Sequence, residues 1–145
     1  MASVIDELFD FLTGNETETR QIHPGTVRLV DVCRKHFYGH AAHDCNAFVK
    51  AVASELRIPV PDKNANGILQ TIRQGGIWVP VGSPIEALRW AREGYFVLAG
   101  LRSDEMPGES NGHVAIVSPA PMHKGHMGQP RLWCGSKGHA WGRVG

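Results

Sequence analysis

The residues best suited to chemistry begin at Cys45, a cysteine that follows Asp44 at the point where an apolar helical pattern starts. The apolar positions after it recur at the spacing of one helix face: Phe48, Val49, Val52 and Leu56. Asp44 is placed to be the N-cap, with its carboxylate accepting a hydrogen bond from a backbone N–H of the first turn. The positive end of the helix dipole would favour a Cys45 thiolate, and a neighbouring histidinium would lower the pKa of the thiol. This stretch predicts a nucleophile, and a small core residue is the alternative that it leaves open.

His113 is the histidine most easily connected with Cys45 as a general base. It is the first residue of the apolar run His113–Val117 and directly follows Gly112, a small residue that leaves room for substrate. If this run is a strand that packs against the Cys45 helix, the thiol and the imidazole come within hydrogen-bonding reach. The histidine would then accept the thiol proton and later protonate the leaving amine. The alternative is a surface histidine at a loop–strand junction.

A third residue normally orients the imidazole of such a pair. Cys134 is the most polar inward candidate on the strand that we expect beside His113. Cysteine is a weak hydrogen-bond acceptor, so a backbone carbonyl could serve instead. A buried structural thiol is an equally acceptable role for Cys134.

Metal binding has to be considered because the chain contains eight histidines. Residues of metal-ligating type occur as a dense run of Cys33, His36, His40, His43 and Cys45 and as a pair of His123 and His126. Zinc sites usually combine closely paired ligands, such as C-x2-C with H-x3–5-H. The spacing here is irregular, and several of the histidines have neighbours typical of solvent-exposed positions. We therefore expect no bound metal and no cofactor.

The composition is that of one soluble globular domain of 145 residues. The net charge is +1 and no basic block occurs, which argues against nucleic-acid binding. No apolar run approaches the roughly 18 residues of a membrane span. The acidic N-terminus lacks the basic and apolar segments of a signal peptide, so we expect synthesis in the cytoplasm without one. The three cysteines are too few and too scattered for a disulfide framework.

Helical patterns come first in the chain and strand patterns follow. The first expected helix is Ser3–Leu12, the second is capped by Thr26 and closed by Gly39, and the third runs from Cys45 to about Arg57. A short fourth helix is expected to be capped within Asn64–Asn66. The fifth begins at Ser83, presents Ile85, Leu88 and Ala91, and ends near Gly94. The fifth has the best local signal, the capping box Ser83-Pro84-Ile85-Glu86. The expected strands are Tyr95–Leu101, His113–Val117 and Arg131–Gly135. Helices followed by an antiparallel meander indicate an α+β fold.

With Cys45 and His113 assigned, the sequence resembles the NlpC-type papain-like peptidases and amidases that cut bacterial cell-wall peptides. More specifically, it is similar to the first family of type VI secretion amidase effectors. The similarity extends from Asp44 to Gly138, interrupted by dissimilar loops. Its matching stretches are Asp44–Val49, Val52–Leu56, Ile58–Pro61, Asn64–Asn66, Gly94–Leu101, Gly112–Val117 and Trp133–Ser136.

The resemblance implies a papain-like fold in which N-terminal helices pack on a small antiparallel sheet and the nucleophile lies at a helix N-terminus. It maps the nucleophile onto Cys45, the base onto His113 and the third site residue onto Cys134. It implies hydrolysis of amide bonds in peptidoglycan stem peptides, typically between D-glutamate and meso-diaminopimelate. It further implies injection into the periplasm of a target cell, a component of the secretion apparatus as partner, and a cognate immunity protein in the producing cell.

Four features depart from the family pattern. Within an expected single domain of residues 1–145, residues 1–40 form an additional N-terminal helical segment beyond the matched part. Asn46 replaces the serine common after the nucleophile. The chain stops at Gly145, where such proteins usually continue. The loop Arg102–Gly112 is longer than expected and leads directly to the candidate base.

Two alternatives to an injected effector remain open. The first is a phage or housekeeping cell-wall hydrolase of the same fold, which differs in delivery and in the bond it cuts. The second is a non-catalytic histidine-rich binding module.

Overall fold

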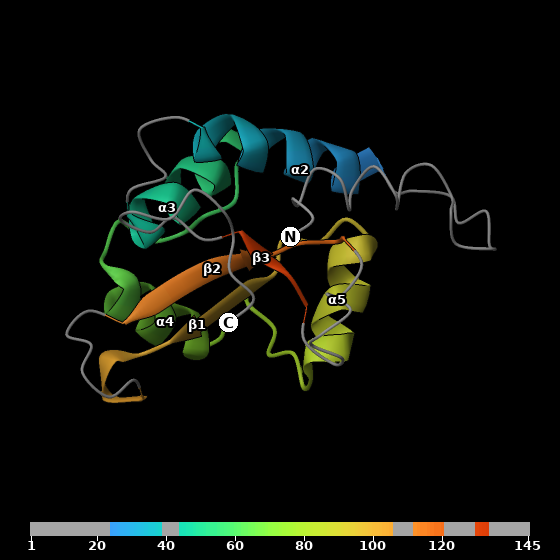
Figure 1. The fold of residues 1–145 in the computed structure, drawn as a ribbon. Coiled ribbons are helices and arrows are strands. Elements are labelled where there is room, and N and C mark those ends of the chain that lie inside the picture. The colour runs from blue at the N-terminus through green and yellow to red at the C-terminus, as the bar shows by residue number, and fades with distance from the viewer. Residues whose placement is uncertain (1–23, 39–43, 106–111, 121–129, 134–145) are drawn as a thin grey trace.

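The elements of the fold follow the order predicted from the sequence, with helices first and strands second (Figure 1). A computed structural model describes residues 24–38, 44–105, 112–120 and 130–133. The helices are α2 (Pro24–Phe37), α3 (Cys45–Glu55), α4 (Ala65–Arg73) and α5 (Pro84–Arg92). The strands are β1 (Leu98–Leu101), β2 (His113–Val117) and β3 (Leu132–Trp133), and a short 3-10 turn, η2 (Ser103–Glu105), follows β1. The predicted α+β class is confirmed.

The strands form one antiparallel three-stranded sheet in the order β1-β2-β3, which is the predicted meander. Leu101 of β1 lies opposite His113, and Trp133 of β3 lies opposite Ile116. The helices α3, α4 and α5 all contact β2, the central strand. In Figure 1, α2 lies above α3 on the outer side of the molecule, and α5 lies at the other end of the sheet from α4. The position of β2 is therefore fixed by both neighbouring strands and by three helices.

The main core lies where α2 and α3 cover β2. Phe48, Val49 and Val52 of α3 are fully buried, as their helical spacing predicts. Val114 and Ile116 of β2 belong to the same cluster and are also fully buried. They lie two residues apart, so strand alternation places them on the same face. Burial of each large apolar side chain contributes about 1.5–3 kcal/mol, and this shared face therefore holds α3 on β2.

Thr26 has a different role from the one predicted. Because α2 begins at Pro24, Thr26 lies inside the helix and does not cap it. Its buried hydroxyl donates to the backbone carbonyls of Ala91 and Arg92 at 3.3 and 3.1 Å. These carbonyls belong to the C-terminal end of α5, where intrahelical N–H partners run out. Thr26 therefore joins α2 to α5, a contact between segments far apart in the sequence.

The capping box of α5 forms with one change. Ser83 Oγ accepts the backbone N–H of Glu86 at 3.2 Å, as predicted, but the Glu86 carboxylate accepts the N–H of Gly82 at 3.1 Å, one residue before the cap. Leu88 is buried on the packed face, whereas Ile85 is 55% exposed. The expectation that Ile85 shares this face is wrong because the buried part of α5 begins one turn later.

Several sequence expectations concern residues that the structure does not describe. The helix expected at Ser3–Leu12 falls outside the described ranges, as does Gly135 at the end of the third expected strand. The first expected strand is shorter than its apolar run, because ladder pairing begins at Leu98 and not at Tyr95. Within the described ranges, none of the helices has the length and apolar content needed to cross a membrane.

Replacing Thr26 by Val should destabilise the protein by about 1–2 kcal/mol, because the shape is kept while two carbonyls lose their buried donor. Urea unfolding followed by circular dichroism would measure this as a lower midpoint at an unchanged m-value. Val27→Thr makes the reverse change at an adjacent exposed position and should shift the stability by less than about 0.5 kcal/mol. Equal midpoints for Thr26→Val and the wild type would contradict the assigned contact.

Candidate active site

The first turn of α3 presents Cys45 as predicted. Asp44 is the N-cap, and its Oδ1 accepts the backbone N–H groups of Asn46 and Ala47 at 3.0 and 3.3 Å. The backbone carbonyl of Asp44 accepts the N–H of Phe48 at 2.9 Å and closes the first helical turn. Cys45 is thus the first residue of a well-capped helix, half-buried against the main core.

The sulfur of Cys45 meets the beginning of β2. The backbone N–H of Val114 lies beside this sulfur and lowers the pKa of its thiol, and Val114 is the residue directly after His113. His113 is half-buried at the first position of the strand, as its sequence pattern predicts. The packing of α3 on β2 therefore brings the segment that carries the candidate nucleophile to the segment that carries the candidate base.

The electrostatics of Cys45 differ from the sequence expectation. Burial raises the pKa of the Cys45 thiol above its ordinary value, and the neighbouring Asp44 carboxylate raises it as well. The nearby backbone N–H groups of Val114, Asn46 and Cys45 itself lower the pKa, but the pKa stays raised overall. The prediction of a lowered pKa at the helix N-terminus is therefore wrong in direction, and the thiol needs a base to remove its proton.

The other predicted site residues do not join Cys45 in the part of the chain that is described. Cys134 lies just beyond β3, outside the described residues. Cys33 is buried in the core on α2, and this burial raises the pKa of its thiol far above its ordinary value. His36 lies 3.3 Å from a carboxylate oxygen of Glu55 on α3. The described residues contain no group of three or more side chains that could hold a metal ion.

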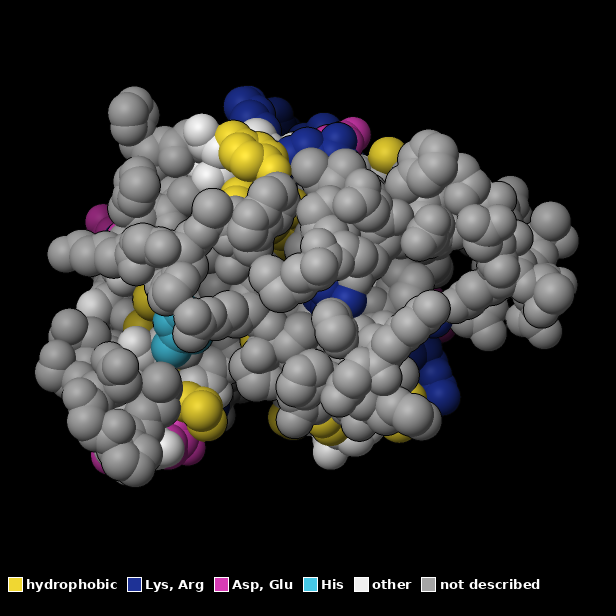
Figure 2. Space-filling model, viewed as in Figure 1, with side chains coloured by type: hydrophobic (Ala, Val, Ile, Leu, Met, Phe, Trp, Pro, Cys, Tyr) yellow, Lys and Arg dark blue, Asp and Glu magenta, His cyan; other side chains and the backbone are white. Residues whose placement is uncertain are grey.

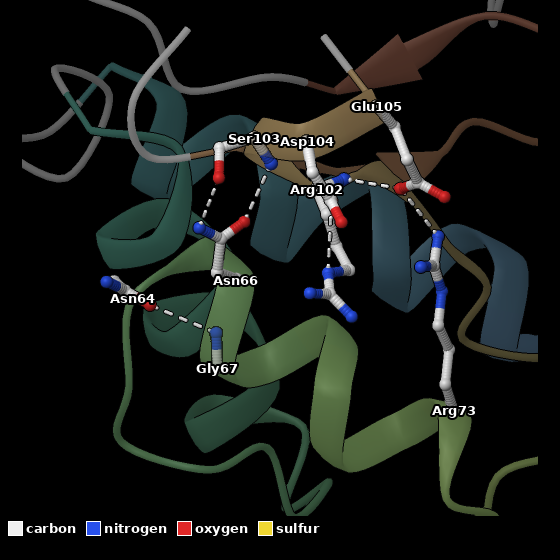
Figure 3. Close-up of polar contacts among 8 residues, drawn as sticks. All are labelled: Asn64, Asn66, Gly67, Arg73, Arg102, Ser103, Asp104 and Glu105. Carbon is white, nitrogen blue, oxygen red and sulfur yellow. Dashed lines mark hydrogen bonds and ion pairs between the residues drawn. The ribbon is translucent and has the colours of Figure 1, made fainter.

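The connection from β1 to β2 is attached to α4 by charged side chains (Figure 3). Glu105 Oε2 accepts a hydrogen bond from Arg73 Nη2 of α4 at 3.0 Å and one from the backbone N–H of Arg102 at 2.6 Å. Arg102 Nε in turn lies 3.3 Å from Asp104 Oδ1. The pKa of the Glu105 carboxyl is held below its ordinary value, first by the Arg73 hydrogen bond and then by the Arg102 N–H. The chain leaving β1 is therefore anchored before it returns to the start of β2.

Sequence analysis missed Asn66, which contacts this connection. It was assigned only to a segment that could cap α4, whereas Asn64 alone is the N-cap and accepts the N–H of Gly67 at 3.0 Å. The side chain of Asn66 points instead to Ser103 (Figure 3). The sequence contains one signal for this different role. A helix start needs one capping side chain, and the segment supplies two asparagines.

Charged side chains of both signs are visible on the face seen in Figure 2. Lys and Arg side chains gather at the top, over α2, with an acidic side chain beside them, and acidic side chains are seen again at the lower left. On α2, the exposed residues Arg28, Asp31 and Lys35 supply charges of both signs. The described part of this face thus presents mixed charge around hydrophobic side chains.

The comparison with known proteins identifies a relative. The chain is 37% identical over 100 residues to the peptidoglycan amidase Tse1 of Pseudomonas aeruginosa. The chain is a homologue of this amidase. The match covers 69% of the chain and 59% of the length of the relative, so the chain spans less than two thirds of it. No protein-family model matches the chain.

This homology confirms the resemblance found in the sequence. It also agrees with the α+β arrangement, in which four described helices precede a small antiparallel sheet and Cys45 lies at a helix N-terminus. The assignment of Cys45, His113 and Cys134 to catalytic roles stays a prediction.

Replacing Asp44 by Asn should lower the pKa of Cys45, because the substitution removes a negative charge and keeps an oxygen that can cap α3. The pH dependence of Cys45 alkylation by iodoacetamide, followed by mass spectrometry of the peptide, should shift to lower pH. Asp62→Asn removes the same charge from an exposed position paired with Lys50 and should leave the profile unchanged. A midpoint that stays in place or rises in Asp44→Asn would contradict the assigned role of this carboxylate.

Proposed function

We propose that the protein is a peptidoglycan amidase that hydrolyses amide bonds of stem peptides, with Cys45 as nucleophile and His113 as general base. The observation that carries the proposal is the position of Cys45 at the capped N-terminus of α3, with its sulfur at the backbone of Val114, the neighbour of His113. The homology to the peptidoglycan amidase Tse1 supports the substrate class.

In the proposed mechanism, His113 takes the proton of the Cys45 thiol as the sulfur attacks the scissile carbonyl carbon. The imidazolium then gives this proton to the leaving amine as the C–N bond breaks, which leaves an acyl-enzyme. Water, activated by the same imidazole, hydrolyses the thioester and restores the thiol. Because burial raises the pKa of Cys45, the thiol depends on a general base to remove its proton.

The oxyanion formed in each half-reaction needs a hydrogen-bond donor close to the sulfur. In the first turn of α3, the N–H groups of Asn46 and Ala47 donate to the Asp44 side chain and that of Phe48 to the Asp44 carbonyl. The N–H of Cys45 is the remaining donor of this turn, and we assign the oxyanion to it.

The finer expectations follow from the resemblance to type VI secretion amidase effectors. We propose cleavage between D-glutamate and meso-diaminopimelate, action in the periplasm of a target cell after injection, and inhibition by a cognate immunity protein in the producer. A secretion-apparatus component is the partner expected for delivery. A phage or housekeeping wall hydrolase would share Cys45 and His113 but differ in delivery and in the bond cut.

Replacing Cys45 by Ala should reduce the release of stem-peptide fragments from purified peptidoglycan at least about a thousandfold, because no acyl-enzyme can form. His113→Ala should cause a loss of similar size, because the nucleophile stays protonated. Mass spectrometry of the released fragments would identify the scissile bond. Cleavage by Cys45→Ala at the wild-type rate would refute the mechanism.

Cys33→Ala is the matched control for the loss of a thiol. Cys33 is fully buried in the core on α2, so this variant should lose stability but keep its activity below its melting temperature. Cys134→Ala tests the third predicted residue directly, and a fall in activity without a fall in stability would assign Cys134 to the site.

A further inference from the structure

We propose that Asn66 of α4 is a positioning residue that fixes the first residues of β2 and, through them, the imidazole of His113. The inference rests on the proposed function for the role of His113. It concerns a side chain that need not touch the substrate and that acts through Ser103 and the backbone at Gly112.

Asn66 holds the chain that leaves β1 by two hydrogen bonds to one residue (Figure 3). Its Nδ2 donates to Ser103 Oγ at 2.8 Å, and its Oδ1 accepts the backbone N–H of Ser103 at 2.9 Å. Both bonds are partly buried, and they join residues 37 positions apart in the sequence. A side chain that uses both ends of its amide on one residue fixes the distance and the orientation of that residue.

The helix itself does not require this side chain. Asn64 already accepts the N–H of Gly67 and caps α4, as Figure 3 shows beside the Asn66 contact. Asn66 lies inside the first turn, where asparagine has a lower helix propensity than alanine. The residue is therefore explained by its contact with the connection and not by the needs of α4.

The side-chain amide of Asn66 also lies next to Gly112. A Cβ added to Gly112 would lie 2.5 Å from Asn66 Oδ1 and 2.8 Å from the carbonyl oxygen of Leu101. Gly112 has φ of +69°, a left-handed conformation that glycine adopts without strain. The chain thus turns into β2 in contact with Asn66, and the next residue is His113.

The consequence for the site follows from the sheet register. His113 lies opposite Leu101, and the backbone N–H of the residue after it, Val114, lies beside the Cys45 sulfur. The start of β2 is therefore bounded by the Asn66 contact on one side and by the Cys45 helix on the other. Without Asn66, Ser103 and Gly112 lose their common support, and the first residue of the strand is free to fray at the end that carries the imidazole.

Asn66→Ala and Asn64→Ala form a matched pair for the test, because both remove an asparagine side chain from the start of the same helix. Only Asn66→Ala should lower kcat for peptidoglycan fragments, by roughly ten- to a hundredfold with KM nearly unchanged, because a displaced catalytic group costs rate more than binding. Asn64→Ala should lower the melting temperature and leave kcat within about twofold at temperatures where the protein is folded.

The pH profile of Cys45 alkylation by iodoacetamide gives a readout that does not need peptidoglycan. His113→Ala should slow alkylation near neutral pH. Asn66→Ala should slow it as well, whereas Asn64→Ala should be alkylated at the wild-type rate. Asn66→Asp should restore the wild-type rate, because the Ser103 hydroxyl can turn to donate to the new carboxylate while its backbone N–H keeps its acceptor.

The outcomes separate this inference from the proposed function. If the wild type releases no peptidoglycan fragments but Asn66→Ala still shares the alkylation defect of His113→Ala, the substrate assignment fails and the positioning role stands. If Asn66→Ala keeps the wild-type kcat and alkylation profile while His113→Ala changes both, the positioning role is overturned. If His113→Ala itself alkylates like the wild type, the Cys45–His113 pair and the inference built on it both fail.

Discussion

The candidate site depends on the packing of α3 against β2. The buried face of the helix, with Phe48 and Val52, meets the face of the strand that carries Val114 and Ile116. This contact sets where the first residue of the helix meets the first residues of the strand, so an apolar interface positions two polar groups.

The same packing creates the electrostatic problem of the site. Placing Cys45 against the core desolvates its thiol, and the Asp44 carboxylate that stabilises the helix start adds a negative charge beside it. The two roles of Asp44 oppose each other: as a cap it stabilises α3, and as an anion it disfavours the thiolate. The backbone N–H groups of Val114 and Asn46 compensate only in part. The proposed nucleophile therefore relies on a base to remove its proton.

Local signals predicted the parts of the fold that local physics determines. The Asp44 cap, the Ser83 cap and the exact bounds of β2 follow from residues within a few positions of each other. The direction of the Cys45 pKa shift did not follow, because burial is set by the whole core and cannot be derived from the helix terminus alone. Thr26 was misplaced for a related reason: its hydroxyl bonds to carbonyls 65 and 66 residues away, and no nearby pattern contains those partners.

Two glycines show how closely α4 approaches the sheet at the candidate base. A Cβ on Gly100 would lie 2.6 Å from Leu69 Cδ2 and 2.7 Å from the backbone carbonyl oxygen of His113, and one on Gly112 would lie 2.5 Å from Asn66 Oδ1. The Leu69 contact at Gly100 is apolar, and the Asn66 contact at Gly112 is polar. Helix α4 therefore supports the start of β2 by packing on β1 and by hydrogen bonding beside β2. Protein interiors are packed too densely to accept an added methyl group at either glycine. A larger residue at Gly100 or Gly112 would therefore have to displace the helix or the strand. Gly100 and Gly112 are thus the positions where helix and sheet come close enough to hold His113 in register.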